Sequence, residues 1–412
     1  MKKEEFFARA IPGSVGPLQG IKILEATVFA AGPLVGTVLT DLGAESVKCD
    51  PPETGDTLRR MGPFVGEEPD LEASSFYLAI NRNKKSITLK LSSPEGQEIF
   101  RDLAQRVDVV VQNFKPGTMD KWGLGYEAIR RIKPDVIYTS ISGFGQFGPL
   151  SHKPGFDSVG QAMGGLMNIN GYPDRPPMRV GNAIIDNITG WMGAMATISA
   201  LFYREKTGEG QHIDANLLDT TLYASDMALT ATAHTGLQWQ RTGGRHPSAP
   251  PSVYSCIEDY VLIILVVDSH WARFCRIAGR EDLIDDPRTQ TGAARGQHPE
   301  LIEEVVAPWT RERTVKEVVS TLEEAEIVVA PILNYEQILE NDHVRERGMI
   351  EEVEHSIHGK LKLYGVGPKL SRTPGSVRSA APLLGEHNQE VYRDWLGLSG
   401  EKLAQLKDKG VI

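Results

Sequence analysis

The feature of this sequence that most restricts its fold is a strand–helix–strand pattern that repeats between residues 21 and 141. Short apolar stretches typical of buried strands lie at residues 21–26, 47–49, 86–91, 107–111 and 136–141. Helical patterns separate them at residues 32–42, 93–105 and 126–132. This alternation predicts the α/β class, with an open, doubly wound, Rossmann-like parallel sheet.

The chain is too long for a single hydrophobic core. At 412 residues it exceeds the size at which one core stops growing, so we expect two domains. A large domain is expected at residues 1–224, a smaller α+β domain at 225–330, and a C-terminal segment at 331–412. Residues 243–251 are rich in glycine and proline and are the expected linker. Further elements are expected as a helix at 187–205, a strand at 212–215, a helix at 216–234 and a hairpin at 253–256 and 260–267.

Composition and charge exclude several classes of partner. The net charge of −10 argues against nucleic-acid binding, because phosphate backbones are bound by basic surfaces. The widely spaced Cys49, Cys256 and Cys275 form no CxxC pair, so we expect reduced thiols and no metal site. The charged N-terminus lacks the apolar core of a signal peptide, and the longest apolar run, residues 261–267, is too short for a membrane span. A cytoplasmic protein with no membrane partner is expected.

The first strand–helix turn argues against a nicotinamide cofactor. Asp50 ends the second strand, where dinucleotide-binding folds carry the acid that binds ribose. The turn itself reads ATVFAAGP and lacks the GxGxxG fingerprint that cradles a pyrophosphate. A nicotinamide-binding or non-enzymatic α/β protein is thus disfavoured and is kept only as an alternative. Measuring whether NAD or CoA raises the melting temperature would distinguish it.

Polar and basic residues collect where the predicted strands end. Residues 113–117 and 143–146 follow two strands, at the edge where open α/β sheets bind ligands. Basic side chains lie nearby at Arg82, Lys84, Lys85, Lys90, Lys115 and Lys121. They form either part of a ligand site or a solvated lysine face.

Asp186 is the strongest candidate for a reactive group. Three apolar residues precede it, and a long helical pattern begins at Asn187. At a helix N-terminus, free N–H groups and the helix dipole favour the ionised form of a carboxylate, which can act as a nucleophile. The common alternative is that Asp186 simply caps the helix.

Seven phrases, in order along the chain, resemble the family III CoA-transferases, the group that contains formyl-CoA transferase and carnitine CoA-transferase. The resemblance extends from about Leu18 to the end of the sequence. The phrases are GIKILEATVFAAGP, DLGAESVKCD, NRNKKSITLKL, VQNFKPGTMDKWGLGYE, KPGFDSVGQAMGGLMNINGYPDRPP, REKTGEGQHID and PLLGEHNQEVYRDWLGLSGEKLAQLKDKGVI.

The resemblance implies that Asp186 carries the chemistry. In that family an aspartate at the start of the corresponding helix forms acyl anhydride and aspartyl-CoA thioester intermediates, so CoA and acyl-CoA are substrates and a small carboxylic acid is the acceptor. The matching positions for CoA contacts are Ala30, Ala31, Leu89, Lys90, Leu91, Ser92, Asn113, Phe114, Lys115, Lys121, Pro154, Gly155, Phe156 and Asp157. No tightly bound cofactor is implied.

The sequence departs from the family pattern at two contacts. Formyl-CoA transferase has a glutamine where this chain has Ala30, and its adenine-stacking arginine is replaced by Pro51, so Arg59 or Arg60 is the candidate substitute. The resemblance also implies an interlocked homodimer in which the C-terminal segment returns to the large domain.

The runner-up function is an α-methylacyl-CoA racemase, which shares the fold. Such enzymes pair the aspartate with a histidine thirty positions upstream, because racemisation needs two acid–base groups. That position is Phe156 here, and His152 lies four residues earlier. The acids exchanged are undetermined, although Arg179 or Arg245, which lies beside Gly244 and His246, could pair with the second carboxylate of a dicarboxylic acid such as succinate.

Overall fold

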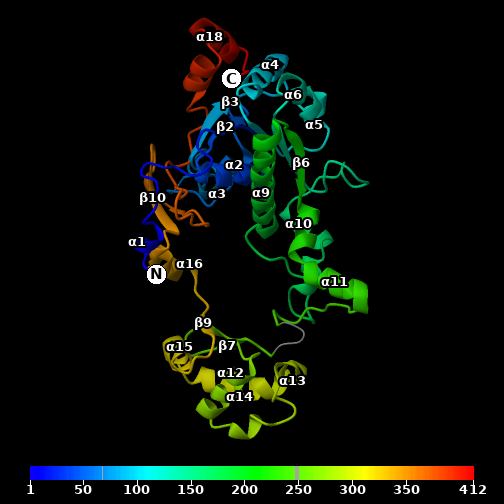
Figure 1. The fold of residues 1–412 in the computed structure, drawn as a ribbon, viewed down its shortest axis with the longest axis vertical. Helices are drawn as coiled ribbons and strands as arrows, with labels where there is room; N and C mark the ends of the chain where they lie inside the picture. Colours follow the sequence, from blue (N-terminus) through cyan, green and yellow to red (C-terminus); the bar gives the residue numbers. More distant parts are fainter. Residues whose placement is uncertain (67, 246–249) are drawn as a thin grey trace. The chain divides into compact units, whose positions relative to one another are not determined.

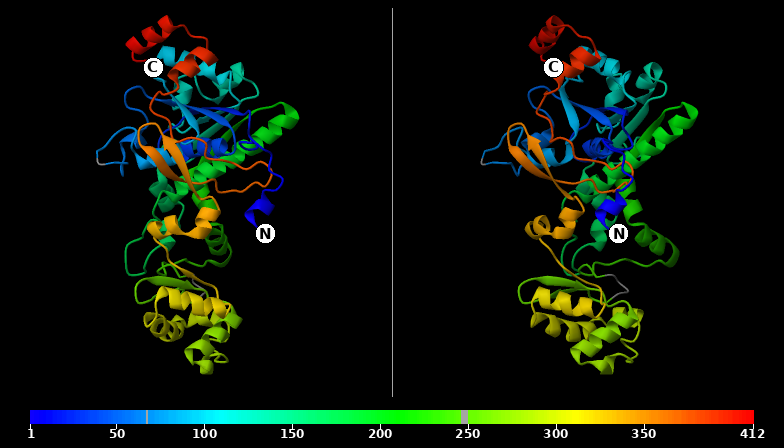
Figure 2. Two further views of the ribbon diagram at one scale, coloured as in Figure 1. Left: turned by 90° about the vertical axis from the view of Figure 1, so that its left-hand side faces the viewer. Right: turned by 60° about the vertical axis from the view of Figure 1, so that its left-hand side comes forward.

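The computed structural model describes residues 1–66, 68–245 and 250–412, and the chain forms two compact units (Figures 1 and 2). The first unit consists of Met1–Gly165, Val180–Asp226 and Asp342–Ile412, and the second of Leu166–Arg179 and Met227–Asn341. Compared with the domains expected from the sequence, the second unit is longer at its C-terminal end and includes an extra segment before the long helix. Residues 246–249 of the expected linker lie outside the described residues.

A six-stranded parallel sheet forms the centre of the first unit and confirms the predicted fold class. Its strands are β1 (Lys22–Ala26), β2 (Glu45–Asp50), β3 (Lys84–Thr88), β4 (Val109–Gln112), β5 (Ile137–Ser142) and β6 (Gln211–Asn216). The spatial order is β3-β2-β1-β4-β5-β6, so the direction of winding reverses between β1 and β4. In such sheets the crevice outside the carboxyl ends of those two strands is the expected ligand site.

Helices cover both faces of this sheet, as expected for a doubly wound fold (Figure 1). In chain order the first unit contains α1 (Lys3–Phe6), α2 (Ala31–Asp41), η1 (Thr57–Arg60), α3 (Ser75–Ile80), α4 (Pro94–Ala104), α5 (Thr118–Lys121), α6 (Tyr126–Ile132), α7 (Asp157–Met163), α9 (Ile184–Thr207) and α10 (Leu217–Ala224). The single helix predicted at residues 216–234 is wrong, because the chain breaks at Ser225 and α11 (Asp226–Thr235) begins after it.

Small residues allow α9 to pack closely on the sheet and on α2. A Cβ atom at Gly190 would lie 2.7 Å from the Cβ of Leu34, and one at Gly193 would lie 2.9 Å from Val35 and from Ile141. Both distances are shorter than ordinary van der Waals contacts. The glycines therefore set the separation of α9 from its neighbours.

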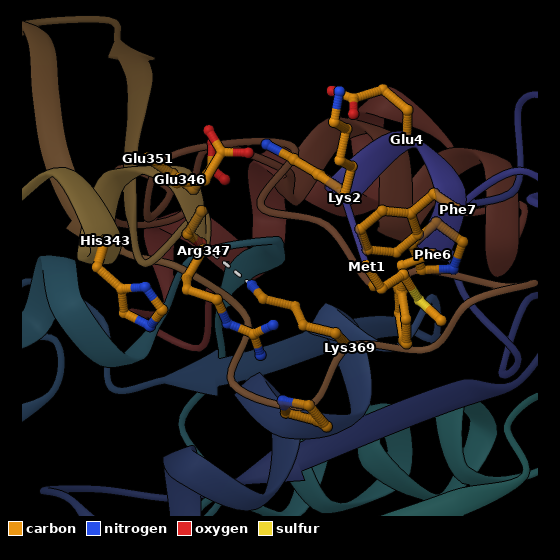
Figure 3. Close-up of a pocket in the computed structure, with 15 residues that line it drawn as sticks. Met1, Lys2, Glu4, Phe6, Phe7, His343, Glu346, Arg347, Glu351 and Lys369 are labelled. Carbon is orange, nitrogen blue, oxygen red and sulfur yellow. Dashed lines mark hydrogen bonds between the residues drawn. The ribbon is translucent and has the colours of Figure 1, made fainter. Parts of the chain in front are cut away.

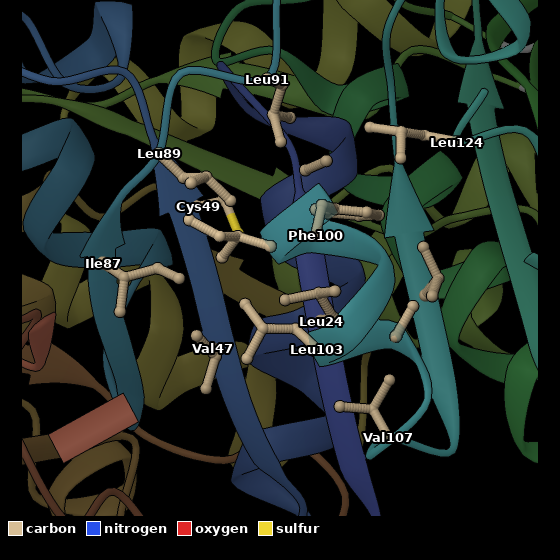
Figure 4. Packing of buried hydrophobic residues seen from close by; sticks show 14 of the residues in the cluster. Leu24, Val47, Cys49, Ile87, Leu89, Leu91, Phe100, Leu103, Val107 and Leu124 are labelled. Carbon is tan, nitrogen blue, oxygen red and sulfur yellow. The ribbon is translucent and has the colours of Figure 1, made fainter. Parts of the chain in front are cut away.

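The C-terminal segment completes the core of the first unit. It contains α17 (Asp342–Glu346), the hairpin of β10 (Ile350–His355) and β11 (Gly359–Tyr364), η3 (Glu390–Trp395) and α18 (Gly400–Asp408). Buried side chains of the sheet and α4, such as Leu24, Val47 and Phe100 (Figure 4), belong to the same cluster as Tyr392 and Leu406. The amide of Lys90 also donates to the carbonyl of Val411 at 2.8 Å. Residues of this segment therefore form part of the core of the first unit.

The opposite face of β1, β2 and β3 carries a cluster of buried charges. Lys84 Nζ lies 3.0 Å from Glu25 Oε2, while Lys48 Nζ lies 2.5 Å from Asp50 Oδ1 and 3.0 Å from Asp56 Oδ2. These five side chains are almost completely buried. Unpaired charges at such depth would be strongly destabilising, so the pairing is required for the fold.

Two further contacts join this buried ion cluster to the surrounding elements. Lys48 Nζ also donates to the carbonyl oxygen of Thr27, the residue that follows β1, at 2.7 Å. On α2, a Cβ atom at Gly36 would lie only 1.9 Å from Glu25 Oε1. Glycine at this helical position makes room for the buried carboxylate.

The second unit is a smaller α+β fold, as predicted. Its antiparallel sheet contains β7 (Val253–Ser255), β8 (Tyr260–Ile263) and β9 (Val329–Pro331). Helices pack on it around buried residues such as Trp271, Phe274 and Ile302. The remaining elements are α8 (Leu166–Ile169), α12 (Asp268–Ala278), η2 (Glu281–Leu283), α13 (Gly292–Gln297), α14 (Pro299–Arg311), α15 (Val315–Glu324) and α16 (Tyr335–Glu340).

Within residues 1–66, 68–245 and 250–412, no helix combines the length and apolar character needed to cross a bilayer.

The close approach of Gly36 to Glu25 can be tested by substitution. We expect Gly36→Ala to lower the free energy of unfolding by about 1–3 kcal/mol, because the clash with Glu25 outweighs the better helix propensity of alanine. Gly400→Ala is the matched control, since it lies at the start of α18 with open space around its Cα. Urea-induced unfolding of both variants measures the effect. Equal stability of Gly36→Ala and the unaltered protein would contradict the packing described here.

Candidate active site

A cavity of about 250 Å³ lies outside the carboxyl ends of β1, β4 and β5. It is therefore at the position where the winding of the sheet reverses. Its walls come from the β1–α2 turn, the segments that follow β4 and β5, and the first turn of α9. The lining residues are Val28, Phe29, Ala30, Ala31, Asn113, Phe114, Lys115, Pro116, Ile141, Ser142, Gly143, Lys153, Pro154, Gly155, Phe156, Asp186 and Leu217.

Asp186 lies in the first turn of α9, as the third residue of the helix. The alternative that Asp186 caps this helix is therefore wrong. The capping acceptor is Asp157 instead, whose Oδ1 accepts the N–H groups of Ile185 at 2.8 Å and Asp186 at 3.3 Å. Because another carboxylate satisfies these donors, the side chain of Asp186 is left to face the cavity.

The environment of Asp186 disfavours its charge. Removal from water raises the pKa of Asp186 to about 7, and the negative charge of Asp157 adds to the rise. The helix N-terminus was expected to favour ionisation, but desolvation outweighs it. Near neutral pH, Asp186 is thus divided between a neutral acid and a poorly solvated carboxylate, which is a state suited to nucleophilic or acid–base chemistry.

The β1–α2 turn is held by side chains from other elements. Asn113 pairs with both backbone groups of Val28: its Oδ1 accepts the N–H at 2.8 Å, and its Nδ2 donates to the carbonyl at 2.7 Å. Asp56 Oδ1 accepts the N–H of Phe29 at 3.1 Å, which holds that residue in the left-handed region with φ 60°. These N–H groups are therefore not available to cradle a phosphate, as the missing glycine fingerprint predicts.

Two aromatic rings form one wall of the cavity. The rings of Phe29 and Phe156 pack edge to face with their centroids 5.5 Å apart. Beside them, the backbones of Gly143 and Gly155 approach so closely that a Cβ on Gly143 would lie 2.6 Å from the Cα of Gly155. Phe156 is thus on the cavity that contains Asp186, at the position where the racemases have a histidine.

The structure brings together most of the residues implied by the resemblance. Those that line the cavity with Asp186 are Ala30, Ala31, Asn113, Phe114, Lys115, Pro154, Gly155 and Phe156. Those outside the lining are Leu89, Lys90, Leu91, Ser92, Lys121 and Asp157. Leu89 and Leu91 place their side chains in the core, whereas Lys90, Ser92 and Lys121 are exposed.

Several lining residues were missed from the sequence. They are Val28, Phe29, Ile141, Ser142, Lys153 and Leu217, whereas Pro116 and Gly143 lie in the segments predicted at the ligand edge. Five of these six lie at the end of a strand or within three residues after it, so the rule that ligands bind at the carboxyl ends of parallel strands could have found them.

Two polar residues with suggested ligand roles are used in the interior instead. Asp50 does not resemble a ribose-binding acid, because its carboxylate is fully buried against Lys48. Arg59 cannot stack on an adenine, because its guanidinium is fully buried and donates to Tyr77 Oη at 2.6 Å. Arg60 is exposed and stays a candidate for that contact.

The basic residues near the strand ends are divided between the interior and the surface. Arg82 and Lys84 are buried and paired with Asp41 and Glu25, so the solvated lysine face is wrong for them. Arg179 and Arg245 belong to the second unit. The side chains of Lys115 and Lys153 are exposed and lie at the cavity itself.

A larger cavity, of about 770 Å³, lies elsewhere in the first unit (Figure 3). It is lined by residues of α1 and by residues between 343 and 375, such as Arg347 and Lys369. None of these residues follows a strand of the parallel sheet, and Lys369 Nζ is occupied by the carbonyl of Val366 at 2.6 Å. The smaller cavity at the switch point is the candidate active site because it holds Asp186.

In the part of the chain that the structure describes, no three His, Cys, Asp or Glu side chains are grouped closely enough to hold a metal ion. The chemistry available in the cavity is that of one perturbed carboxylate, two lysines and apolar walls.

Comparisons with known proteins agree with this architecture. Residues 18–388 match the profile of CoA-transferase family III. The succinyl-CoA–D-citramalate CoA-transferase of Chloroflexus aurantiacus is 36% identical over 398 residues, covering 96% of this chain and 98% of the relative. The succinyl-CoA:glutarate CoA-transferase of Mus musculus is 36% identical over 406 residues, covering 97% of this chain and 91% of the relative.

A solved structure shares the fold. The CaiB/BaiF family protein of Brucella suis superposes with a TM-score of 0.83 and 32% sequence identity, covering 92% of this chain and 99% of that protein. With the family profile and the curated relatives, this structure confirms the resemblance and the class of enzyme. The chain belongs to CoA-transferase family III and is a CoA-transferase.

Proposed function

We propose that this CoA-transferase moves CoA from succinyl-CoA, or a closely related dicarboxylic acyl-CoA, to a small carboxylic acid through covalent intermediates on Asp186. The observation that carries the proposal is the single perturbed carboxylate in a cavity at the switch point of the sheet. The names of the two curated relatives above, both succinyl-CoA-dependent, support the donor.

The proposed reaction begins with attack on the donor. A carboxylate oxygen of Asp186 bonds to the thioester carbonyl carbon, the C–S bond breaks, and a mixed anhydride and the CoA thiolate result. The thiolate then attacks the aspartyl carbonyl and displaces the donor acid as its carboxylate. The product of this half-reaction is an aspartyl-CoA thioester.

The second half-reaction reverses these steps with a different acid. The acceptor carboxylate attacks the aspartyl thioester carbonyl and expels the CoA thiolate, which forms a second anhydride. The thiolate attacks the acceptor acyl carbon of this anhydride and releases acyl-CoA together with the free carboxylate of Asp186. No proton, oxidant or reductant is consumed in the cycle.

The walls of the cavity suit these intermediates. A partly desolvated carboxylate has lost the hydration that would weaken its attack, and Phe29, Phe156 and Leu217 give the cavity apolar walls. Exclusion of water matters because anhydrides and thioesters hydrolyse. We propose that CoA contacts the lining residues named above and reaches the exposed residues Lys90, Ser92 and Lys121 with its nucleotide end.

The cavity supports transfer over racemisation. Its titratable lining groups are Asp186, Lys115 and Lys153, and a phenylalanine occupies the position of the racemase histidine. Phenylalanine cannot carry a proton between the two faces of an α-carbon. Deuterium uptake at the α-carbon of a 2-methylacyl-CoA at turnover rates would favour the racemase.

We further propose that two copies of the chain associate. The side chains of Trp191, Met195 and Phe202 lie along one face of α9 and are 52%, 58% and 63% exposed. An apolar stripe of this kind is typical of a protein interface. We expect sedimentation equilibrium to give twice the chain mass of 45.3 kDa. A monomer at micromolar concentration would contradict this association.

Replacing the proposed nucleophile tests the mechanism. We expect Asp186→Asn to lower kcat by about 10⁴-fold or more in an exchange assay with succinyl-CoA and a panel of acids, because no anhydride can form. In the unaltered protein, labelled donor followed by borohydride or hydroxylamine should mark Asp186, as peptide mass spectrometry would detect. Full exchange activity of the variant, or a label that never reaches Asp186, would refute the proposal.

The same variant should fold normally. The folded protein holds the Asp186 proton more tightly than the unfolded chain does, so ionisation lowers the free energy of unfolding as the pH rises from 3.8 to about 7. At pH 8, Asp186→Asn should therefore melt at the same temperature as the unaltered protein or at a higher one.

The charge of Asp157 predicts a shift in the pH profile. We expect kcat/KM to rise with pH as Asp186 ionises, with an apparent pKa of about 7. Asp157→Asn keeps an oxygen for the N–H groups of α9 but removes the negative charge. The rise of kcat/KM should therefore occur at lower pH in this variant. Asp102→Asn, an exposed position on α4, is the control. If the apparent pKa of this rise is unchanged or higher in Asp157→Asn, the charge of Asp157 does not raise the pKa of Asp186.

A further inference from the structure

Gln161 is a buried side chain that the proposed chemistry does not use directly. It lies on α7, one helical turn after Asp157, and is 0% exposed. Its Nε2 donates to Asp157 Oδ2 at 2.7 Å and to the carbonyl of Val180 at 3.1 Å. Its Oε1 accepts the N–H of Val180 at 2.8 Å. Both ends of the amide are therefore occupied.

These bonds continue to the first turn of α9. Asp157 Oδ2 accepts a hydrogen bond from Gln161 Nε2. Its other oxygen, Oδ1, accepts the N–H groups of Ile185 and Asp186. A continuous series of hydrogen bonds thus runs from the backbone of Val180 through two side chains to the backbone of Asp186. Neither oxygen of Asp157 is left without a donor.

The backbone between the two ends of this series is strained. Asn182 and Ala183 both have left-handed conformations, with φ 62° and 44°. This conformation is unfavourable for a residue such as alanine, and it persists where the surrounding structure fixes both sides. Here Gln161 fixes Val180 on one side, and Asp157 fixes Ile185 on the other.

The contact to Val180 is also at a junction in the chain. The chain leaves the first unit after Gly165, contributes Leu166–Arg179 to the second unit, and returns at Val180. Val180, whose backbone Gln161 hydrogen-bonds, is therefore the first residue of the returning segment and lies six positions before Asp186. The side chain of Asp186 is therefore carried by this returning segment.

We propose that Gln161 is a positioning residue for the transfer reaction, which orients Asp157 and the returning backbone so that Asp186 meets the thioester in a reactive geometry. This role rests on the proposed acylation of Asp186. Gln161 is absent from the cavity lining, so it acts through Asp157 and Val180. Misplacement of a reacting group by about 1 Å costs about 100-fold in rate, which sets the scale of the effect.

The position requires a side chain that can both donate to Asp157 and accept from Val180. A glutamate would place a second negative charge beside Asp157 and could not donate to it, and a lysine could not accept the N–H of Val180. Methionine matches the length of glutamine but has neither strong donor nor strong acceptor. Gln161→Met therefore removes the hydrogen bonds with little change in volume.

We expect Gln161→Met to lower the rate of acyl-enzyme formation about 10–100-fold while the KM for acyl-CoA changes less than about twofold. Thr197→Val is the matched control, because this buried hydroxyl on α9 bonds to Gly193 and Thr139 and is not at the site. It should react at the rate of the unaltered protein. Rapid-quench trapping of the labelled enzyme measures both rates.

A second variant covers the case in which Gln161→Met does not fold. A protonated carboxyl group has one donor and one acceptor, so it can keep the hydrogen bonds to Asp157 and to the N–H of Val180, whereas the ionised group cannot donate. The rate of Gln161→Glu divided by that of the unaltered protein should therefore rise as the pH falls. A residue needed only for folding would give a ratio independent of pH.

The outcomes separate this inference from the proposed function. If the unaltered protein is never labelled at Asp186, the proposed function fails. If it is labelled, and Gln161→Met reacts at the same rate or the Gln161→Glu ratio stays flat, the positioning role of Gln161 is refuted while the proposed function stands.

Discussion

The pairing of buried lysines with buried carboxylates beneath β1, β2 and β3 is the interaction on which the site depends. Each of these charges would be strongly destabilising alone, and together they tie three strands to the turn that follows β1. Lys48 holds the carbonyl of Thr27, and Asp56 holds the N–H of Phe29. In dinucleotide-binding folds, glycines leave the corresponding backbone free to bind phosphate. Here side chains of this protein occupy the N–H groups of Val28 and Phe29, and the turn forms a wall of the cavity.

The site contains two aspartates whose surroundings separate their roles. Asp157 accepts three N–H groups and is buried in the packing between α7 and α9. Asp186 lies on the cavity, and removal from water raises its pKa to about 7. One carboxylate has its hydrogen bonds satisfied by neighbouring N–H groups, while the other is poorly solvated and faces the cavity. Such divergence between neighbouring acids is how a single residue type supplies different functions in one site.

Local sequence patterns were sufficient for the sheet but not for its long-range pairings. Short apolar stretches predicted the first five strands, and the rule for parallel sheets placed residues 113–117 at the ligand edge. Nothing near Lys48 in the sequence indicates that it pairs with Asp56. Likewise, nothing near Arg59 indicates that its guanidinium donates to the carbonyl of Pro382. The start of α9 was misplaced because alanine at position 183 gives no sign of a left-handed backbone. The functional importance of Asp186 came from resemblance, since capping aspartates share its local pattern.

The C-terminal segment has a consequence for how the protein is made. Tyr392 donates to the carbonyl of Thr88 at 2.6 Å, and Val411 accepts from Lys90, so contacts separated by more than three hundred residues close the core beside β3. During synthesis on the ribosome, the strands emerge long before the segment that covers them. The apolar residues of the sheet that contact α18 therefore stay uncovered until α18 has been synthesised. The second unit is synthesised in that interval and carries its own core, so it can form while the sheet is still unfinished.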